Sequence, residues 1–536
     1  MTTTATIKNA LKNVTTNPNH TNHAGGTSFR RSLNEQLIQV LSTNTLNDTF
    51  YIRKEQLATE TVEVILKARE TDHRFLAQAI VWARQEGLMK LVPILALAIL
   101  SGKKGIELRL FLNTFQKTIL TPDDLRTFVS IIKEGGIPGR SGIGGVVREA
   151  VRTWMGGISE YHAIKYGSEK SEGVTLRDIL RLTHPKPDSP VMNERFGWLT
   201  GSRESDFMMN QQILAFEKLK RAKTEEEIVT LVRQGKLPYE VVVPTVPKMT
   251  KAVWVELLHQ APYMNLLRNL RSFREHGVFE DQANVEFAVA KLTNPGAVEK
   301  SRVLPFRFFD ALKAYSYNDM QDMRIRDAIA QGLELSFVNL PDFGSDGKHV
   351  TIGSDVSGSM SNCPISERGQ VMCIDVCGIF TGALLKRTGN ALALPFETRV
   401  IHNAGLSKHD SVATTASKIA SIGGGGTAVG APIEYLLDRK IKTDVFIGIT
   451  DNEDWACGSE YYTSDYFFPL WLRYKKEVNP NAVAFLVTIA AYRDAVAPEG
   501  SDVHFIYGWS DKVLNYIGLK LKTGASQVDD IRKIDV

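Results

Sequence analysis

The hydrophobic pattern of this chain changes character once, near residues 340–348, and this change limits the folds open to it. Between about 30 and 335, apolar residues recur every three or four positions, as in 74–88 and 264–277, which is the spacing of amphipathic helices. After the Gly/Asp/Pro-rich segment 340–348, short apolar runs alternate with helical stretches. We therefore expect an all-α region followed by an α/β domain.

The expected helices are short and amphipathic, and Pro, Gly and Asn-rich breaks separate them. Such a helix cannot bury its apolar face alone, so a series of them favours stacked helix pairs of the solenoid kind. No sharp repeat period is evident, and periodicity leaves open whether the solenoid is open or closed. The apolar stretch 91–100 is too short to span a bilayer and is predicted to be a buried helix.

The second region contains runs that are apolar on both faces and alternate with helical stretches. These runs lie at 349–356, 391–397, 444–450, 482–490 and 503–509. Strands buried on both faces and separated by helices indicate a parallel, doubly wound sheet. The predicted organisation is a flexible tail over 1–27, a helical domain over 28–345 and an α/β domain over 346–536.

Composition narrows the class of protein and its compartment. The chain has 43% hydrophobic and 23% charged residues, which is ordinary for a soluble globular protein. No stretch of 18 apolar residues occurs, and the first twenty residues lack the apolar core of a signal peptide. The four cysteines form no CxxC motif. We therefore expect a cytoplasmic protein with reduced thiols and no membrane segment.

Polar motifs in the second region predict a cation site. Asp355 follows the first expected strand, and Ser357 and Ser359 alternate with it, so that their oxygens can point to one side. Asp451 follows another strand, and Thr427 comes after four glycines. In open α/β sheets, ligands bind beyond the carboxyl ends of the strands. Two carboxylates and three hydroxyls form an all-oxygen set that suits one Mg²⁺ or Mn²⁺ ion.

The order D-x-S-x-S, then Thr, then T-D resembles the metal-ion-dependent adhesion site of von Willebrand factor A domains. With the open metal position facing a partner, bridging an acidic protein ligand is favoured over catalysis. The alternative is that Ser357 and Ser359 only cap the next helix while Asp451 lies in an ordinary turn. The P-loop, G-x-S-x-G and HExxH patterns are absent from the sequence.

Basic residues gather on several expected helix faces. Steps of about 100° per residue place Arg177, Arg181 and His184 within one sector of a helix. Pro185 should end that helix just after His184, with Lys186 beyond it. Arginine clusters of this kind suit phosphate groups through bidentate contacts. The alternative is an ordinary solvated helix face.

Two further basic pairs lie on other expected helices. Arg148 and Arg152 stand four residues apart after a glycine-rich loop, whose free N–H groups at the helix start favour an anion. Arg268 and Arg271 face away from the apolar side of their helix. Together with a modest positive excess in the larger region, these pairs are consistent with a polyanionic partner.

The order of segments is similar to that of the Ro ribonucleoprotein autoantigen family, whose TROVE domain precedes a von Willebrand factor A-like domain. The matching stretches are ALAILS at 96–101, REAVRTW at 148–154, LRLTHPKP at 180–187, LLRNL at 266–270, KSRVLPF at 300–306, DVSGSM and TDNE. The resemblance implies an all-α HEAT-like helical-repeat ring, monomeric, followed by a Rossmann-like von Willebrand factor A domain.

The resemblance also implies an RNA-binding function. Single-stranded 3′ ends of misfolded non-coding RNA would enter the hole of the ring, and small structured Y-like RNAs would bind its outer surface. An exoribonuclease would be tethered through the RNA. The motif matches carry RNA contact over to Arg148, Arg177, Arg181, His184 and Lys186. Glu149 departs from the family, because a basic residue is expected there, and this removes one expected phosphate contact of the outer surface.

Two other functions compete with the non-enzymatic RNA-binding protein. In one, the chain is a metal-dependent protein-interaction module and the helical region is only a scaffold. In the other, it is an RNA-cleaving metal enzyme. The enzyme is disfavoured because two serines and a threonine tune an attacking water poorly and no general base is evident.

Overall fold

A computed structural model describes the larger part of the chain. The described residues are 29–43, 46, 53–167, 173–201, 209–315, 320–337, 347–365, 370–456, 466–490, 494–497, 502–508, 514, 516–518, 520–521 and 527–536. The predicted flexible tail over 1–27 and most of the predicted linker over 340–348 lie outside them.

The described residues belong to two compact units that interleave along the chain. The α/β unit combines Met1–Ala96, Leu304–Asp310 and Leu333–Val536, and the helical unit combines Leu97–Val303 and Ala311–Gly332. The predicted domain limits, 28–345 and 346–536, divide the chain into two continuous segments, whereas the two units are defined by contacts. The limits stay a prediction.

The helical unit is all-α in its described part, as the hydrophobic spacing predicts. Its elements, of which α5, α19 and α20 also have residues in the α/β unit, are α5 (Leu91–Leu100), α6 (Leu108–Thr118), α7 (Pro122–Glu134), α8 (Val146–Gly156), α9 (Glu160–Gly167), α10 (Leu176–Thr183), α11 (Pro190–Thr200), α12 (Gln211–Leu219), α13 (Glu225–Gly235), α14 (Tyr239–Thr245), α15 (Lys251–Gln260), α16 (Tyr263–Glu275), the 3₁₀ helix η1 (Val278–Glu280), α17 (Gln282–Leu292), α18 (Pro295–Ser301), α19 (Pro305–Ala314) and α20 (Met320–Leu335).

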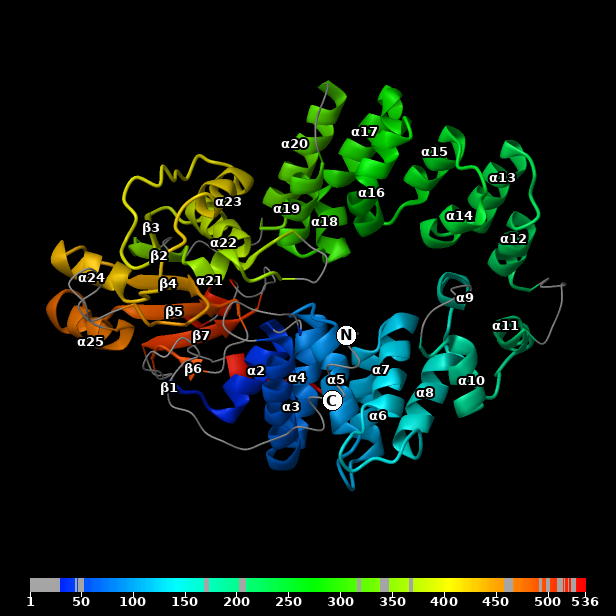
Figure 1. Cartoon of the computed structure of the whole chain (residues 1–536), viewed down its shortest axis with the longest axis horizontal. Coiled ribbons are helices and arrows are strands. Elements are labelled where there is room, and N and C mark those ends of the chain that lie inside the picture. The colour runs from blue at the N-terminus through cyan, green and yellow to red at the C-terminus, as the bar shows by residue number, and fades with distance from the viewer. Residues whose placement is uncertain are drawn as a thin grey trace. The chain divides into compact units, whose positions relative to one another are not determined.

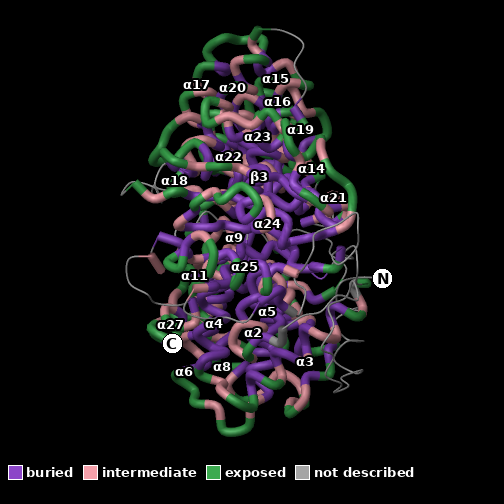
Figure 2. The backbone as a smooth tube through the Cα atoms, turned by 90° about the vertical axis from the view of Figure 1, so that its left-hand side faces the viewer, coloured by how far each residue is buried: buried purple, intermediate pink, exposed green. Residues whose placement is uncertain are grey.

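Helices close in sequence pack on one another, for example α6 on α8, α10 on α11 and α12 on α13 (Figure 1). Helix α5 is buried along nearly its whole length (Figure 2), which confirms the prediction for 91–100. The HEAT-like ring stays a prediction.

The α/β unit contains the predicted sheet. Its elements are β1 (Phe29–Arg30), α2 (Leu33–Thr43), α3 (Lys54–Thr71), α4 (His73–Gln85), β2 (Val350–Asp355), α21 (Gly358–Ser361), α22 (Cys373–Arg387), β3 (Ala391–Phe396), α23 (Val412–Ala420), α24 (Ala431–Asp438), β4 (Val445–Thr450), α25 (Phe467–Glu477), β5 (Val483–Thr488), β6 (Asp494–Ala495), β7 (Val503–Tyr507) and α27 (Gln527–Ile531).

Five strands form one parallel sheet in the order β3-β2-β4-β5-β7, and the expected fold class of a helical region followed by an α/β domain is confirmed. Strand order reverses at β2, because β3 lies on one side of it and β4 on the other. In open α/β sheets this reversal opens a crevice beyond the carboxyl ends of the strands. The carboxyl ends of β2 and β4 are therefore the place where a ligand is expected.

Helices cover both faces of the sheet, which is why β2 and β4 are buried throughout. On one face, the hydroxyl groups of Ser354 in β2 and Thr381 in α22 lie 2.7 Å apart. On the other face, the ring of Phe446 in β4 packs near Phe467 and Trp471 of α25. Alternate residues of a strand face opposite sides, so both faces of the central strands require apolar or satisfied side chains.

The N-terminal helices α2 and α4 belong to the α/β unit rather than to the helical one. Gln39 in α2 donates to the carbonyl of Ala490 (3.0 Å), beyond the end of β5. Gln78 in α4 donates to the carbonyl of Arg532 (2.7 Å), next to the C-terminus. Strand β1 also pairs with β6 in an antiparallel bridge. The hydrophobic pattern does not predict these long-range contacts.

Candidate functional site

The five predicted cation ligands converge at the carboxyl ends of the two central strands. Asp355 is the last residue of β2, and Asp451 directly follows β4, the neighbouring strand. Ser357 and Ser359 lie on the turn that begins α21, and Thr427 lies on the loop between α23 and α24. All five side chains are buried. The structure thus places the five oxygens where the topology expects a ligand.

Hydrogen bonds fix the carboxylate of Asp355 in place. Its Oδ1 accepts from the backbone N–H of Ser357 (2.9 Å), and its Oδ2 accepts from the hydroxyl of Thr450 (2.6 Å). The hydroxyls of Ser357 and Ser359 lie 3.0 Å apart, and Oδ1 of Asp451 accepts from the backbone N–H of Glu453 (3.1 Å). A carboxylate offers about four lone-pair sites, so Asp355 keeps acceptor capacity for a further ligand.

Two oxygens of the site, Thr427 Oγ1 and Asp451 Oδ2, are buried without a hydrogen-bond partner among the described residues. Burial raises the pKa of Asp355 above its ordinary value. Burial and, after it, the charge of Asp355 raise the pKa of Asp451 well above its ordinary value. No described Lys, Arg or His side chain forms an ion pair with either carboxylate. A divalent cation would supply a compensating positive charge and use these oxygens as ligands, so the residues fit the predicted group.

This oxygen set holds only two carboxylates, and its capacity for a cation depends on the hydroxyl groups. In the part of the chain that the structure describes, no group of three or more His, Cys, Asp or Glu side chains is arranged to hold a metal. A site of this composition suits a hard cation that prefers oxygen.

The glycine-rich loop reaches the site by approaching the backbone of β2 closely. Gly423 has a φ of +85°, and a Cβ there would lie 2.1 Å from the carbonyl oxygen of Val356. The N–H of Gly358 donates to the carbonyl of Gly425 (2.8 Å), which ties this loop to the turn before α21. Only glycine fits this approach, which brings the loop of Thr427 against the turn that carries Ser357 and Ser359.

Two residues of the site were given no role by the sequence analysis, although Thr450 belongs to the quoted T-D motif. Thr450 orients Asp355, as described above, and Asp454 anchors the loop of Thr427. The carboxylate of Asp454 accepts from the N–H of Val429 (3.0 Å) and from the N–H of Phe467 (3.1 Å) at the start of α25. The acidic run after β4 is the signal that could have pointed to Asp454.

The predicted basic cluster of the helical unit is centred on α10. A capping box of Thr175 and Asp178 starts this helix, with reciprocal hydrogen bonds of 3.1 and 3.0 Å. The helix ends at Thr183, and His184 follows in the left-handed conformation with a φ of 49°. The predicted helix end before Pro185 is confirmed. The reversal of the backbone at His184 turns the following residues away from the helix axis.

Three of the predicted basic residues are already engaged in holding backbone. Arg152 in α8 donates from Nε to the carbonyl of Thr183 (2.6 Å), and Arg177 donates from Nε to the carbonyl of Leu199 at the end of α11 (3.3 Å). Arg148 donates to the carbonyl of Ile143 in the glycine-rich loop (3.2 Å). Arg152 and Arg177 therefore cap the C-termini of α10 and α11, where unpaired carbonyls favour a cation.

Arg181, His184 and Lys186, which we call the basic turn, are exposed. No described residue forms a hydrogen bond or an ion pair with any of these three side chains. Arg181 and His184 border a pocket of about 510 Å³ between α10, the following turn and α11. The basic turn is thus available to an anionic ligand at the mouth of a pocket.

The other predicted pair lies elsewhere in the helical unit. Arg268 and Arg271 are on α16, which packs on α15, α17 and α18, in a different part of this unit from α10 (Figure 1). Arg271 forms an ion pair with Glu275 one turn later (2.7 Å). No described residue pairs with Arg268. The structure therefore does not join these two arginines to the basic turn.

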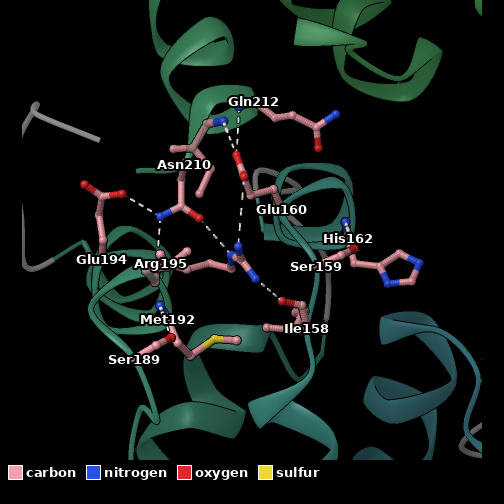
Figure 3. A network of polar contacts seen from close by, with 12 residues as sticks. Ile158, Ser159, Glu160, His162, Ser189, Met192, Glu194, Arg195, Asn210 and Gln212 are labelled. Atoms are coloured by element: carbon pink, nitrogen blue, oxygen red, sulfur yellow. Dashed lines mark hydrogen bonds and ion pairs between the residues drawn. The ribbon is translucent and has the colours of Figure 1, made fainter. Parts of the chain in front are cut away.

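The far wall of the pocket is α11, which the sequence analysis did not single out. A polar network holds this helix from its other side (Figure 3). Arg195 donates to the side chain of Asn210 (3.0 Å) and to the carbonyl of Ile158. Asn210 in turn donates to the buried carboxylate of Glu194 (2.5 Å). Glu160 accepts from the N–H of Gln212 (2.7 Å), which links α9 to the start of α12.

Comparisons with known families match two parts of the chain. The TROVE domain matches residues 242–337, and the Ro60 vWA domain matches residues 349–500. The first match begins after the basic turn, whereas the second includes all five predicted cation ligands.

Two curated relatives and one solved structure are similar to this chain. The RNA-binding protein RO60 of Deinococcus radiodurans is 27% identical over 324 residues, which cover 55% of this chain and 56% of the relative. That of Caenorhabditis elegans is 28% identical over 258 residues, 45% of this chain and 38% of the relative. The chain thus spans about half or less of the length of the relatives it matches.

The crystal structure of the Deinococcus radiodurans RO (RSR) protein covers 90% of this chain and 99% of that one, with a TM-score of 0.65 and 18% identity. At this identity the likeness concerns the fold alone. None of the described helices is both long and apolar enough to cross a membrane.

Proposed function

Because this chain belongs to the Ro60/TROVE family with a C-terminal vWA domain, we propose that it binds RNA through the basic turn on α10. The distant homology to RNA-binding protein Ro60 supplies the class of ligand. The residues of the turn supply the chemistry, because guanidinium, imidazole and ammonium groups all donate to phosphate oxygens.

The observation that carries this proposal is the availability of the basic turn on a rigid base. Arg181, His184 and Lys186 form no side-chain hydrogen bond or ion pair with the described residues, whereas Arg152 and Arg177 use their Nε atoms to fix the helix ends around them. A solvated helix face does not require two arginines that cap the helix ends beside it. Because the caps fix the helix ends, the backbone of the turn loses little freedom on binding, and the cost of ordering falls on the side chains alone.

The bound RNA would be a single-stranded 3′ end of misfolded or non-coding RNA, or a small structured Y-like RNA. The role would be RNA surveillance, or that of a ribonucleoprotein adaptor that holds an exoribonuclease through the RNA. These finer assignments follow from the family resemblance. The proposed role is non-enzymatic.

We further propose that Asp355, Ser357, Ser359, Thr427 and Asp451 hold one Mg²⁺ or Mn²⁺ ion. The two buried oxygens without a described partner and the raised pKa values of both aspartates support this proposal. When bound, the ion would offer an open coordination position to an acidic group.

The same observations favour a second function, in which the chain is a metal-dependent protein-interaction module that takes an acidic protein ligand. Trp455, which is 40% exposed, lies against the loop of Thr427, because a Cβ on Gly426 would meet its ring at 2.8 Å. Exposed tryptophan is a frequent anchor in protein interfaces.

Binding of a duplex RNA with a single-stranded 3′ tail, measured across a salt series, tests the RNA proposal. A blunt duplex is the control for the tail, and the protein variants are Arg181→Glu and Lys248→Glu. Lys248 is exposed in the same unit and outside the cluster, so it gives the same change of net charge. Arg177→Glu is avoided, because Arg177 caps α11.

Tail-dependent binding that weakens with salt, is lost in Arg181→Glu and persists in Lys248→Glu is the expected result. Equal loss in both variants would show only a non-specific charge effect. No binding at low salt would refute the RNA proposal and leave the cation site as the functional centre.

A further inference from the structure

The pocket beside the basic turn carries an inference beyond phosphate binding. We propose that it receives one unstacked nucleobase of the bound RNA, with the side-chain amide of Asn193 on the edge of the base and adjoining phosphates on Arg181 and His184. This inference rests on the proposed RNA binding and adds a site for a single nucleotide.

The floor of the pocket is apolar and suits the flat face of a base. Leu180 and Phe196 line it and are 5% and 8% exposed. Gly197, one residue further on α11, also lines it and contributes no side chain. RNA-binding proteins commonly take single-stranded bases out of the stack and bury them against aromatic and apolar side chains. The volume of about 510 Å³ lies within the range of small-ligand sites and has room for a base with its ribose.

Polar groups stand at the rim, where the edge of a base and its phosphates would lie. Asn193 is exposed, lines the pocket, and has a side-chain amide with no described hydrogen-bond partner. Thr200 also lines the pocket, but its hydroxyl donates back to the carbonyl of Phe196 (2.8 Å). An amide offers both donors and an acceptor, so Asn193 can read the Watson–Crick or Hoogsteen edge of a base.

The residues of α11 that line the pocket and the residue that anchors this helix lie on different faces of it. Asn193, Phe196, Gly197 and Thr200 recur at three- and four-residue spacing and therefore share one face of the helix. Arg195, on another face, is held by Asn210 in the network of Figure 3. The wall of the pocket is thus fixed before any ligand arrives, which lowers the cost of binding.

The mouth of the pocket favours a negatively charged ligand over a positively charged one. The charged or titratable side chains that line the pocket are Arg181 and His184, and no described acidic side chain lines it. A nucleotide carries its phosphate next to its base, so one ligand satisfies both the apolar floor and the basic rim.

The test uses the tailed RNA of the previous section with one abasic nucleotide at each tail position in turn. The protein variant Asn193→Trp places a ring in the mouth of the pocket. Its matched control is Val191→Trp, because Val191 is exposed on the same helix and outside the pocket. Thermal unfolding of both variants checks that the fold is retained.

We expect one abasic position to weaken binding to the wild-type protein by about 10-fold, which is within the contribution of one stacked base. Asn193→Trp should weaken binding of intact RNA by a similar factor, and the same abasic position should then cost nothing more. Val191→Trp should bind as the wild type does. This non-additivity is the mark of a base and a side chain competing for one pocket.

Salt-dependent RNA binding that ignores every abasic position, or an Asn193→Trp protein that binds like Val191→Trp, would overturn the base pocket and leave the phosphate contacts standing. Absence of any RNA binding would overturn both proposals together. Nucleoside 5′-monophosphates form a separate arm, titrated without RNA. Tight binding of one of them, with no abasic effect in RNA, would assign the pocket to a free nucleotide and overturn the proposal.

Discussion

Replacing Arg181 by glutamine should weaken RNA binding without changing stability, whereas replacing Arg152 by glutamine should change both. Each substitution removes one positive charge from the same region of the helical unit. Arg181 is exposed and has no described hydrogen-bond or ion-pair partner. The Nε of Arg152 donates to the carbonyl of Thr183 at the end of α10 (2.6 Å). One arginine is therefore expected to contact RNA and the other to position the turn that does.

The expected magnitudes differ in kind. One phosphate contact with single-stranded RNA contributes about 0.7 to the slope of log affinity against log salt. The wild type should bind RNA more tightly than Arg181→Gln at low salt. The ratio of the two affinities should then fall by about 2.6-fold when the salt concentration rises fourfold. The hydrogen bond of Arg152 joins a charged donor to a helix-end carbonyl and is half-buried, so its loss should cost about 1–2 kcal/mol of unfolding free energy.

Fluorescence anisotropy with the tailed RNA at 50 and 200 mM salt measures the first effect, and urea unfolding followed by circular dichroism measures the second. Arg181→Gln should show a shallower salt slope and unchanged unfolding. Arg152→Gln should bind more weakly with an unchanged slope and unfold at lower urea. An unchanged salt slope in Arg181→Gln, or a shallower one in Arg152→Gln, would refute this division of roles.

Three further predictions concern other parts of the chain. Asp451→Asn should raise the melting temperature in EDTA, because it removes a buried charge beside Asp355. It should also abolish the stabilisation by Mg²⁺ or Mn²⁺, which is worth about 2.7 kcal/mol in the wild type when the cation is at 100 times its Kd. An unaltered response to Mn²⁺ would contradict this prediction. Gly423→Ala should lower the melting temperature and weaken Mn²⁺ binding measured by calorimetry, because its Cβ would meet the carbonyl of Val356; wild-type values for both would show that the loop relaxes. Burial lowers the pKa of His162 below its ordinary value of 6.5, so the unfolded state takes up the proton first as pH falls. Stability should therefore drop below about pH 6.5, and less so in His162→Gln, as melting curves at several pH values would show; identical pH profiles would exclude this role.

Local patterns were enough to predict many of the elements and the location of the proposed cation ligands at the ends of strands. Apolar spacing in 174–184 predicts α10 because it depends on neighbours within two turns, and Pro185 marks its end. Asp355 and Asp451 could be paired across 96 positions because both lie at the carboxyl ends of buried strands, and the strand order of such sheets places those ends together.

The remaining features depend on contacts that no local pattern encodes. Arg152 and Arg181 are both basic residues on amphipathic helices. Only the tertiary structure shows that Arg152 caps a helix and that Arg181 forms no described hydrogen bond or ion pair. Asn193 and Phe196 lie on a helix with little amphipathic character, and their pocket exists only where α10 packs on α11. The hydrogen bond between Arg195 in α11 and Asn210 likewise joins residues on either side of 202–208, a segment that is not among those described.

The contacts between the first helices and the last part of the chain set the order in which this chain can fold during its synthesis on the ribosome. Gln39 meets Ala490 across 451 positions of sequence, and α4 meets the residues next to the C-terminus. Helices made first must therefore wait, with their apolar faces uncovered, until almost all of the chain has been synthesised. The helical unit, whose residues lie between these partners, can fold in the meantime. A fragment that begins at residue 346 would lack α2 and α4, which belong to the α/β unit. Expression of the sheet domain alone is therefore expected to yield an aggregation-prone protein.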